Sequence, residues 1–286
     1  DAGFAVRILD ISVPAQPEPG IEYLLGSFSD QAVLDNALMG CSVLIHMAWT
    51  SLPATSNKAP LQDANDNLIG SLRLLDAALA NNVQRVIFAS SGGTVYGVPK
   101  IMPIPEDHVL DPHCAYGISK LAFEKYLQLY TQLHGLETCS LRIANPYGLG
   151  QDALRPQGVI TAFLHRALQG EDIEIWGDGS VVRDFVYITD VADAFVGATQ
   201  VTDLPNVCNI GSGTGTSLNE LLVSIRELTG LPVHCNYLPS RHFDVPVSIL
   251  DIQKAQRCLA WTPQVTLSEG LLHTLKGLQA SLGLNP

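Results

Sequence analysis

The chain has 286 residues, of which 47% are hydrophobic and 15% are charged, and its formal net charge at pH 7 is −12. This balance excludes a disordered chain, because disorder requires low hydrophobicity and high charge. It also disfavours nucleic acid as a partner, since phosphate binding needs a concentrated basic face and the lysines and arginines here are scattered singly.

Short apolar segments rich in Val and Ile alternate with helical patterns through the first half of the chain, and both are predicted from periodicity. In chain order, the predicted strands are 5–10, 42–49, 85–91 and 138–145, and the predicted helices between them are 29–39, 65–80 and 115–133. The second half is predicted to hold helices at 159–169, 189–199, 217–229 and 267–281, and short strands at 173–176 and 233–237. Strand-helix alternation of this kind is typical of an α/β fold with a doubly wound parallel sheet.

The residue patterns of the sequence disfavour a metal site, a membrane span and a signal peptide. The six cysteines form no Cys-x-x-Cys pair, and His134, His165 and His273 have no second ligand at metal spacing, so we expect no metal site. No apolar stretch reaches the ~20 residues that a membrane span needs, and no signal peptide pattern opens the sequence. We therefore expect a cytoplasmic protein with no membrane partner.

Asp10 ends the first predicted strand. In a doubly wound fold the ligand lies beyond the carboxyl ends of the strands, and an acidic residue there commonly binds a ribose 2′-hydroxyl and selects NAD over NADP. From position alone, Asp10 could equally be a turn or helix-capping residue.

Tyr116 and Lys120 are four residues apart in a predicted helix, so their side chains lie on one face. A neighbouring ammonium favours the phenolate, and this pair is expected to lower the tyrosine pKa toward the range of a general base. By itself the pair is weak evidence, because Tyr-x-x-x-Lys occurs by chance on many helices.

Two further motifs give the pair its context: SSGGTVYG at 90–97 and RDFVYITDVADA at 183–194. Together with Tyr116 and Lys120, they resemble the extended short-chain dehydrogenase/reductase family, which contains the nucleotide-sugar epimerases and dehydratases. The resemblance extends from Asp1 to about Trp261. It implies a Rossmann-like dinucleotide-binding domain at 1–146 and a smaller α/β substrate domain at 147–286, with 181–212 returning in part to the first domain.

The activity that the resemblance implies is NAD-dependent epimerisation of a nucleotide-linked hexose through a 4-keto intermediate. Tyr116 would be the base, and Lys120 would hold the nicotinamide ribose and stabilise the phenolate. The expected substrate is a UDP-sugar, UDP-glucose or UDP-GlcNAc. Two alternatives stay open: an NAD(P)-dependent ketoreductase of the same fold, and a sugar-nucleotide-binding protein without turnover.

The resemblance also assigns binding residues. The cofactor positions are Asp10, Ser27, Phe28, Met47, Ala48, Trp49, Asn67, Ser90, Tyr116 and Lys120. The substrate positions are Asn145, Arg183, Arg241, Asp244 and Ser248. Planar guanidinium groups suit a diphosphate, although Arg183 could instead pair with Asp184. The small side chain of Ser248 is expected to leave room for an N-acetyl group, and the helices at 65–80 and 115–133 are the candidates for a homodimer interface.

The sequence departs from the family pattern at two places. Gly92 stands where the family has a Ser or Thr that hydrogen-bonds the sugar 4-oxygen, so we expect Thr94, or else Ser91, to supply the catalytic hydroxyl. Gly93 and Thr94 replace the Asp-Glu pair of the dehydratases, which argues against dehydration. No G-x-x-G-x-x-G precedes the first predicted strand, and we expect that the first strand, glycine loop and helix of the domain are missing from this sequence.

Overall fold

The computed structural model describes residues 2–14, 16–152, 158–240 and 245–284. The chain divides into two compact units. Unit 1 comprises Asp1–Ser90, Cys114–Ser140 and Ala198–Asn206, and unit 2 comprises Ser91–His113, Leu141–Gly197 and Val207–Pro286. The expected domain boundary at residue 146 stays a prediction.

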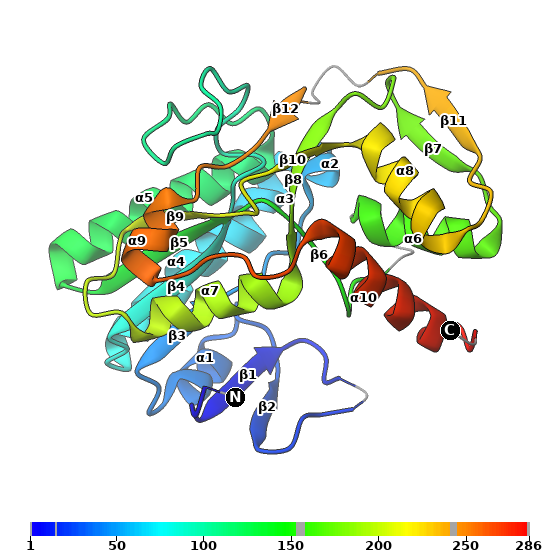
Figure 1. Cartoon of the computed structure of the whole chain (residues 1–286). Helices are drawn as coiled ribbons and strands as arrows, with labels where there is room; N and C mark the ends of the chain where they lie inside the picture. Colours follow the sequence, from blue (N-terminus) through cyan, green and yellow to red (C-terminus); the bar gives the residue numbers. More distant parts are fainter. Residues whose placement is uncertain (1, 15, 153–157, 241–244, 285–286) are drawn as a thin grey trace. The chain divides into compact units, whose positions relative to one another are not determined.

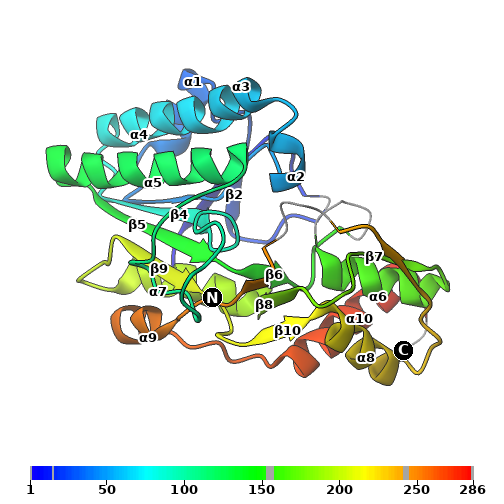
Figure 2. The same cartoon turned by 90° about the horizontal axis from the view of Figure 1, so that it is seen from above.

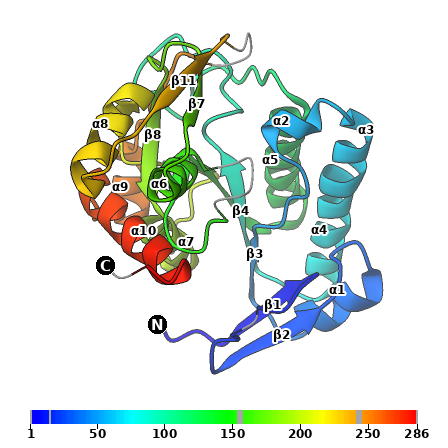
Figure 3. The ribbon, with the colours of Figure 1, turned by 90° about the vertical axis from the view of Figure 1, so that its right-hand side faces the viewer.

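Parallel strands form the framework of unit 1. Strands β1 (Val6–Asp10) and β2 (Ile21–Leu25) pair with each other, and β1 lies beside both β2 and helix α1 (Figure 3). Strand β3 (Val43–His46) pairs in parallel with β4 (Arg85–Ser91). The sheet order in this unit is β3-β4-β5, with β5 at Glu137–Ile143 beginning in unit 1, and strand β9 (Val207–Ile210) belongs to unit 2. Within the described ranges, no strand pairing joins this sheet to β1 and β2.

Helices α4 and α5 lie side by side in unit 1 (Figure 2). The helices of this unit are α1 (Gln31–Leu38), α2 (Pro53–Ser56), α3 (Pro60–Asp63), the π-helix η1 (Ala64–Ile69), α4 (Gly70–Ala80) and α5 (Ala115–His134). Their apolar residues pack with those of β4 into one core that includes Leu34, Leu75, Phe88, Phe123 and Leu127. Burying this much apolar surface is what holds α5, and the residues on its first turns, against β4.

Unit 2 is organised around β8 (Val182–Tyr187), which pairs with three short strands, and around three helices that contact one another (Figure 1). The partners of β8 are β6 (Asn145–Tyr147), β10 (Gly215–Ser217) and β12 (Val247–Ser248), and β7 (Ile173–Trp176) pairs with β11 (Cys235–Leu238). The packed helices are α6 (Val159–Gln169), α8 (Leu218–Thr229) and α10 (Leu267–Ser281). Helices α7 (Ile188–Gln200) and α9 (Gln253–Leu259) complete the set.

The SSGGTVYG segment is anchored in unit 2 by the buried Tyr96. Its hydroxyl donates to Asn209 Oδ1 at 2.6 Å and accepts from Nη1 of the buried Arg142 at 2.9 Å. Gly97 has φ +67°, and a Cβ at that position would collide with the carbonyl oxygen of Asp111. Only glycine allows both this φ and this close approach of the Asp111 carbonyl, which explains why the SSGGTVYG motif ends in glycine.

The predicted α/β class with parallel strands is confirmed, and several elements match to the residue: the strands at 85–91 and 173–176 and the helices at 159–169 and 267–281. The strand predicted at 42–49 is too long, because β3 ends at His46 and the next two residues are exposed. Six strands of the structure have no predicted counterpart: β2, β6, β8, β9, β10 and β12. In the described part of the chain, no helix is both long and apolar enough to cross a membrane, and no cluster of His, Cys, Asp and Glu could hold a metal ion.

Candidate active site

Tyr116 and Lys120 lie on the first turns of α5, whose start is fixed by neighbouring polar side chains. The backbone N–H of Ala115 donates to Asn57 Oδ1 at 2.8 Å, and that of Tyr116 donates to Ser56 Oγ at 3.1 Å. These bonds satisfy two of the N–H groups that a helix leaves unpaired at its start. The short helix α2, which carries Ser56, thus sets where α5 begins and where the pair sits.

Lys120 is buried, with 2% of its surface exposed, and its ammonium lies among aromatic rings. Its Nζ donates to the carbonyl of Ala89 at 2.6 Å and lies 4.0, 4.5 and 5.5 Å from the ring centroids of Trp49, Phe88 and Tyr116. Such contacts stabilise a cation by about 2 kcal/mol when it is desolvated. Burial nevertheless lowers the pKa of Lys120 to about 7, so this lysine can change charge near neutral pH.

The Tyr116 phenol is not activated by its lysine neighbour in this structure. Burial raises the pKa of Tyr116 to about 12, and the charge of Asp63, with that of the Cys114 thiol when it ionises, acts in the same direction. The expected lowering of this pKa is therefore wrong for the geometry seen here. The reason is that the Lys120 ammonium is directed to the Ala89 carbonyl and to the face of the Trp49 ring.

Two buried carboxylates beside the pair were not predicted from the sequence. Asp63, at the end of α3, is 3% exposed, and its Oδ2 accepts from Ser119 Oγ at 2.6 Å. Glu124 is 1% exposed and accepts from Ser90 Oγ. A signal was available for Glu124, because it follows Lys120 by four residues on the same helix face.

His46, at the end of β3, has an uncharged imidazole ring close to Lys120. It is 3% exposed, contacts Ser71 Oγ through Nε2 at 2.8 Å and stacks on Phe88 with the centroids 5.6 Å apart. Burial, with the nearby Lys120 charge, lowers the pKa of His46 to about 3. The imidazole is therefore neutral at physiological pH and adds no charge to the site.

The predicted cofactor residues of unit 1 fall into two groups. The first group lies at the end of β4 and comprises Trp49, Ser90, Tyr116 and Lys120. Close to it, the Oδ1 atom of the buried Asn67 accepts a hydrogen bond from the backbone N–H of Thr50 at 2.7 Å. The others lie at the ends of β1, β2 and β3, where Asp10, Met47 and Ala48 are exposed and Ser27 and Phe28 are partly buried. The Asp10 Oδ1 atom accepts from the N–H and hydroxyl of Ser12, so the residue does form a turn.

The predicted substrate residues of unit 2 gather along β8. Arg183 donates through Nη1 to the carbonyls of Val182 and Val245, at 2.9 and 2.6 Å, and Ser248 lies opposite it on β12. Asn145 donates to the carbonyl of Asp184 at 3.0 Å. The carboxylate of Asp184, the suggested alternative partner of Arg183, accepts from Ser212, Gly213 and Leu250. Arg241 and Asp244 lie outside the described residues.

Two polar atoms that are buried in the described structure have no hydrogen-bond partner there: Trp49 Nε1 in unit 1 and Thr94 Oγ1 in unit 2. Leaving a buried donor unpaired costs about 1–3 kcal/mol. A bound ligand that forms a hydrogen bond with either atom would remove this cost. Ser91, the other candidate hydroxyl, is partly buried.

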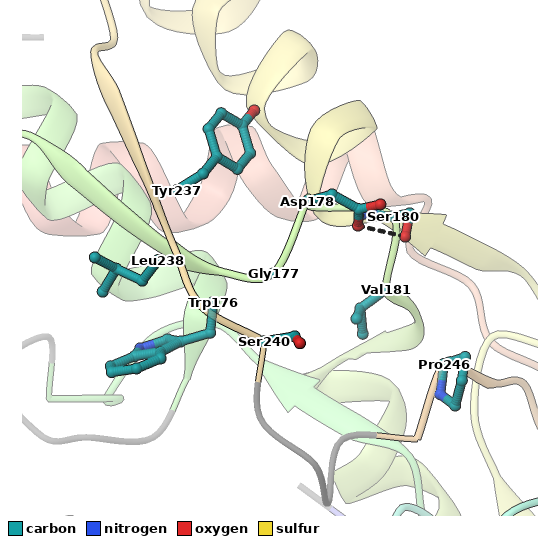
Figure 4. Close-up of a pocket in the computed structure, with 9 residues that line it drawn as sticks. All are labelled: Trp176, Gly177, Asp178, Ser180, Val181, Tyr237, Leu238, Ser240 and Pro246. Atoms are coloured by element: carbon teal, nitrogen blue, oxygen red, sulfur yellow. Dashed lines mark hydrogen bonds between the residues drawn. The ribbon is translucent and has the colours of Figure 1, made fainter.

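Unit 2 also contains a pocket of about 760 Å³ between the ends of β7 and β11 (Figure 4). It is lined by Trp176, Gly177, Asp178, Ser180, Val181, Tyr237, Leu238, Ser240 and Pro246. Trp176 and Tyr237 are 41% and 54% exposed, and their rings point away from each other (Figure 4), with the Tyr237 hydroxyl donating to Asn219 Oδ1 at 3.0 Å. This pocket was not predicted, although an aromatic residue followed by Gly-Asp-Gly at a strand end is a visible signal in the sequence.

A buried lysine four residues after a tyrosine, at the carboxyl end of a parallel strand in an α/β fold, defines an enzyme of the short-chain dehydrogenase/reductase class. The comparison with protein families agrees and is more specific. Residues 8–211 match the NAD dependent epimerase/dehydratase family, and the chain belongs to that family.

Individual relatives support this assignment. The UDP-glucose 4-epimerase of Mycolicibacterium smegmatis is 38% identical over 234 residues, which are 82% of this chain and 75% of the relative. Among solved structures, the UDP-glucose 4-epimerase of Thermotoga maritima with UDP-glucose is 36% identical, with a TM-score of 0.93, and the match covers 98% of this chain and 92% of that one. The UDP-glucose 4-epimerase of Thermus thermophilus in complex with NAD is 31% identical, with a TM-score of 0.89 and coverages of 96% and 91%. The expected family and the expected cofactor, NAD, are thereby confirmed.

The lowered pKa of Lys120 makes the stability of the free protein depend on pH. Below about pH 7 the buried lysine is charged in the folded state and carries its full desolvation cost. Between about pH 7 and 10.5 the unfolded chain binds a proton that the folded chain lacks, so stability rises with pH. We expect Lys120→Met to be more stable than the wild type by about 1–3 kcal/mol at pH 6, with the difference shrinking toward pH 10.

Thermal unfolding followed by circular dichroism from pH 6 to 10 measures this difference. Lys125→Met, at an exposed position of the same helix, is the matched control and should show no such dependence. A stability difference that stays constant between pH 6 and 10 for Lys120→Met would contradict the prediction.

Proposed function

We propose that this chain catalyses the NAD-dependent 4-epimerisation of a UDP-hexose, with UDP-glucose as a substrate. The observation that carries the proposal is the pairing of the half-buried Tyr116 with the buried Lys120 at the end of β4. The family assignment and the relatives named UDP-glucose 4-epimerase support it.

The residues of unit 1 fit an NAD cofactor. The unpaired indole N–H of Trp49 supplies a buried donor, and the exposed carboxylate of Asp10 is available to ribose hydroxyls through Oδ2 while Ser12 occupies Oδ1. Lys120 is placed to donate to a ribose hydroxyl, because an ammonium has three N–H groups and the Ala89 carbonyl takes one. The NAD preference expected from Asp10 follows from repulsion between its charge and a 2′-phosphate.

In the proposed reaction, Tyr116 first loses its own proton to solvent, and the resulting phenolate takes the proton of the sugar 4-hydroxyl and returns it after the ring has turned over. When bound, NAD would supply the acceptor, and then the donor, of the hydride exchanged with carbon 4 of the sugar. The cationic Lys120 stabilises the Tyr116 phenolate once the phenol has lost its proton. The aromatic rings of Trp49 and Phe88 exclude water from that ammonium.

Thr94 is proposed as the hydroxyl that hydrogen-bonds the sugar 4-oxygen in place of the family's Ser or Thr. Its buried Oγ1 has no partner among the described residues, so it is free to donate. Position 92 is unsuited to this role, because a Cβ on Gly92 would collide with the Leu250 side chain. Ser91 is the second candidate.

The nucleotide is proposed to occupy unit 2. The uracil ring is proposed to pack against Trp176 in the pocket at the end of β7, and Arg183, on β8, is proposed to bind the diphosphate. Asn145, Arg241 and Asp244 remain proposed contacts of the UDP moiety. A planar guanidinium binds phosphate oxygens through two parallel hydrogen bonds.

Tyr116→Phe tests the mechanism, because it removes the phenolic proton acceptor and keeps the ring. We expect the wild type to convert UDP-glucose into UDP-galactose without net consumption of NAD, and Tyr116→Phe to lower kcat by at least about 100-fold. Thr94→Val should lower kcat more than Ser91→Ala. Chromatographic separation of the two UDP-sugars measures all three.

Tyr126→Phe, on the exposed face of the same helix, is the matched control and should retain the wild-type rate. Full epimerisation by Tyr116→Phe would show that the assigned base is wrong. Stoichiometric oxidation of added NADH or NADPH by a keto-sugar nucleotide would instead identify a ketoreductase, and binding of UDP-sugar with no turnover would identify a binding protein.

The substrate range is proposed to include UDP-GlcNAc, because Ser248 presents a small side chain at the position expected to face the sugar's 2-substituent. We expect Ser248→Tyr to lower kcat/KM for UDP-GlcNAc at least about 10-fold more than for UDP-glucose, since bulk discriminates by that order. Ser248→Ala should leave the ratio of the two substrates unchanged. A wild-type enzyme that epimerises UDP-glucose and ignores UDP-GlcNAc would refute the proposal.

A homodimer is proposed from an apolar stripe on α5. Ile118, Tyr126, Leu129 and Leu133 are 38–64% exposed, and their spacing places them on one face of the helix. We expect light scattering to give twice the chain mass for the wild type and a monomer for Leu133→Glu. Leu272→Glu, at an exposed position of α10, should remain dimeric, and a monomeric wild type would contradict the proposal.

The cytoplasm is proposed as the site of action. All six cysteines are free thiols in the structure, and two of them, Cys139 and Cys208, are buried in the core. Thiols persist in reducing compartments and tend to form disulfides in oxidising ones.

A further inference from the structure

We propose that Asp63 is a positioning residue of the active site: its buried carboxylate fixes the helix turn that carries Tyr116 and Lys120, and its charge balances the protonation of that pair. The proposal rests on the epimerase mechanism above. It adds to that mechanism a residue that touches neither the phenol nor the ammonium and acts through their surroundings.

The carboxylate of Asp63 joins the loop at Ser51 and the π-helix at Asn67 to α5, which is distant in the sequence. Its Oδ2 accepts from the hydroxyl of Ser119, which lies between Tyr116 and Lys120 on α5, at 2.6 Å. Its Oδ1 accepts from Ser51, in the loop that follows Trp49, and from Asn67 Nδ2 at 3.2 Å. Both carboxylate oxygens are therefore used, and bonds to a charged acceptor are stronger than neutral ones.

Asp63 also stands directly before the π-helix η1. Such widened turns are frequent at functional sites, and this one carries the buried Asn67. The Asp63 bond holds the amide nitrogen of Asn67, which leaves Asn67 Oδ1 to accept from the backbone N–H of Thr50 at 2.7 Å. One carboxylate thus orients both α5 and the amide that holds the loop beside Trp49.

The effect of Asp63 on the pKa values of Tyr116 and Lys120 differs from that of the other charged groups around them. In the described part of the chain, Lys120 is faced by Glu124 on its own helix, by Asp63 and by the neutral His46 on β3, while Tyr116 is faced by Cys114 and Asp63. Glu124 and Asp63 each raise the pKa of Lys120, and Asp63 also raises that of Tyr116. Of the two carboxylates, Asp63 is therefore the one that acts on both members of the pair.

The first test follows the Lys120 amine in the free protein. The chain has six lysines, so their side-chain carbon signals can be resolved by NMR in protein labelled with ¹³C-lysine, with Lys120→Met giving the assignment. We expect Asp63→Asn and Glu124→Gln each to lower the titration midpoint of Lys120 by about 0.5–1 pH unit. Asp76→Asn is the matched control, because Asp76 likewise accepts from a hydroxyl of α5, that of Tyr130 at 2.6 Å, and it should leave the midpoint unchanged.

The second test is the dependence of kcat on pH with UDP-glucose. Removing the Asp63 charge lowers the pKa of both Tyr116 and Lys120, so Asp63→Asn should move both limbs of the profile to lower pH. Glu124→Gln should move the alkaline limb alone. A purely structural role predicts a uniform loss of rate with both limbs in place, and that result, together with an unmoved Lys120 midpoint, would overturn the proposal.

Ser119→Ala separates position from charge, and it covers the case in which Asp63→Asn does not fold. It removes the bond between Asp63 and α5 and keeps the carboxylate. We expect kcat to fall at least about 5-fold at every pH with the limbs unmoved, and an unchanged kcat would refute the positioning role. If the wild type has no epimerase activity, the proposed function fails, and the Lys120 titration still decides the effect of the Asp63 charge.

Discussion

The burial of one ammonium, that of Lys120, constrains the rest of unit 1. A cation that is 2% exposed must find its hydration replaced, and the replacement comes from four segments. The carbonyl of Ala89 accepts a hydrogen bond from it, the rings of Trp49 and Phe88 cover it, and the carboxylates of Asp63 and Glu124 balance its charge. Each of these groups must be held in place, and the core of α4, α5 and β4 does so.

The same burial makes the site responsive to its ligand. The lysine is close to its point of neutrality at pH 7, and the phenol of Tyr116 is far from ionised. In the proposed reaction the phenol must lose its proton before it can act as the base, and the charges of bound ligands are one influence on that equilibrium.

Sequence reasoning succeeded where the chemistry is local. The spacing of Tyr116 and Lys120 depends only on the period of a helix, and the strand at 85–91 and the helix at 159–169 follow from runs of apolar residues. It failed for β2 and β8, which are short and mix polar with apolar residues, so their pairing with other strands decides their conformation. The role of Asp63 could not be predicted either, because its hydrogen bonds to Ser51, Ser119 and Asn67 follow no periodic pattern in the sequence.

By itself, the sequence determined the fold class, the family and the identity of the tyrosine-lysine pair, since these depend on periodicity and on motifs read in order. The tertiary structure decided the electrostatics of that pair. The sequence predicts that Lys120 activates Tyr116, whereas the structure directs the ammonium to Ala89 and Trp49 and raises the pKa of the phenol. The physical reason is that a pKa depends on solvation and on charges from the whole surroundings, and these are set only when distant segments fold together.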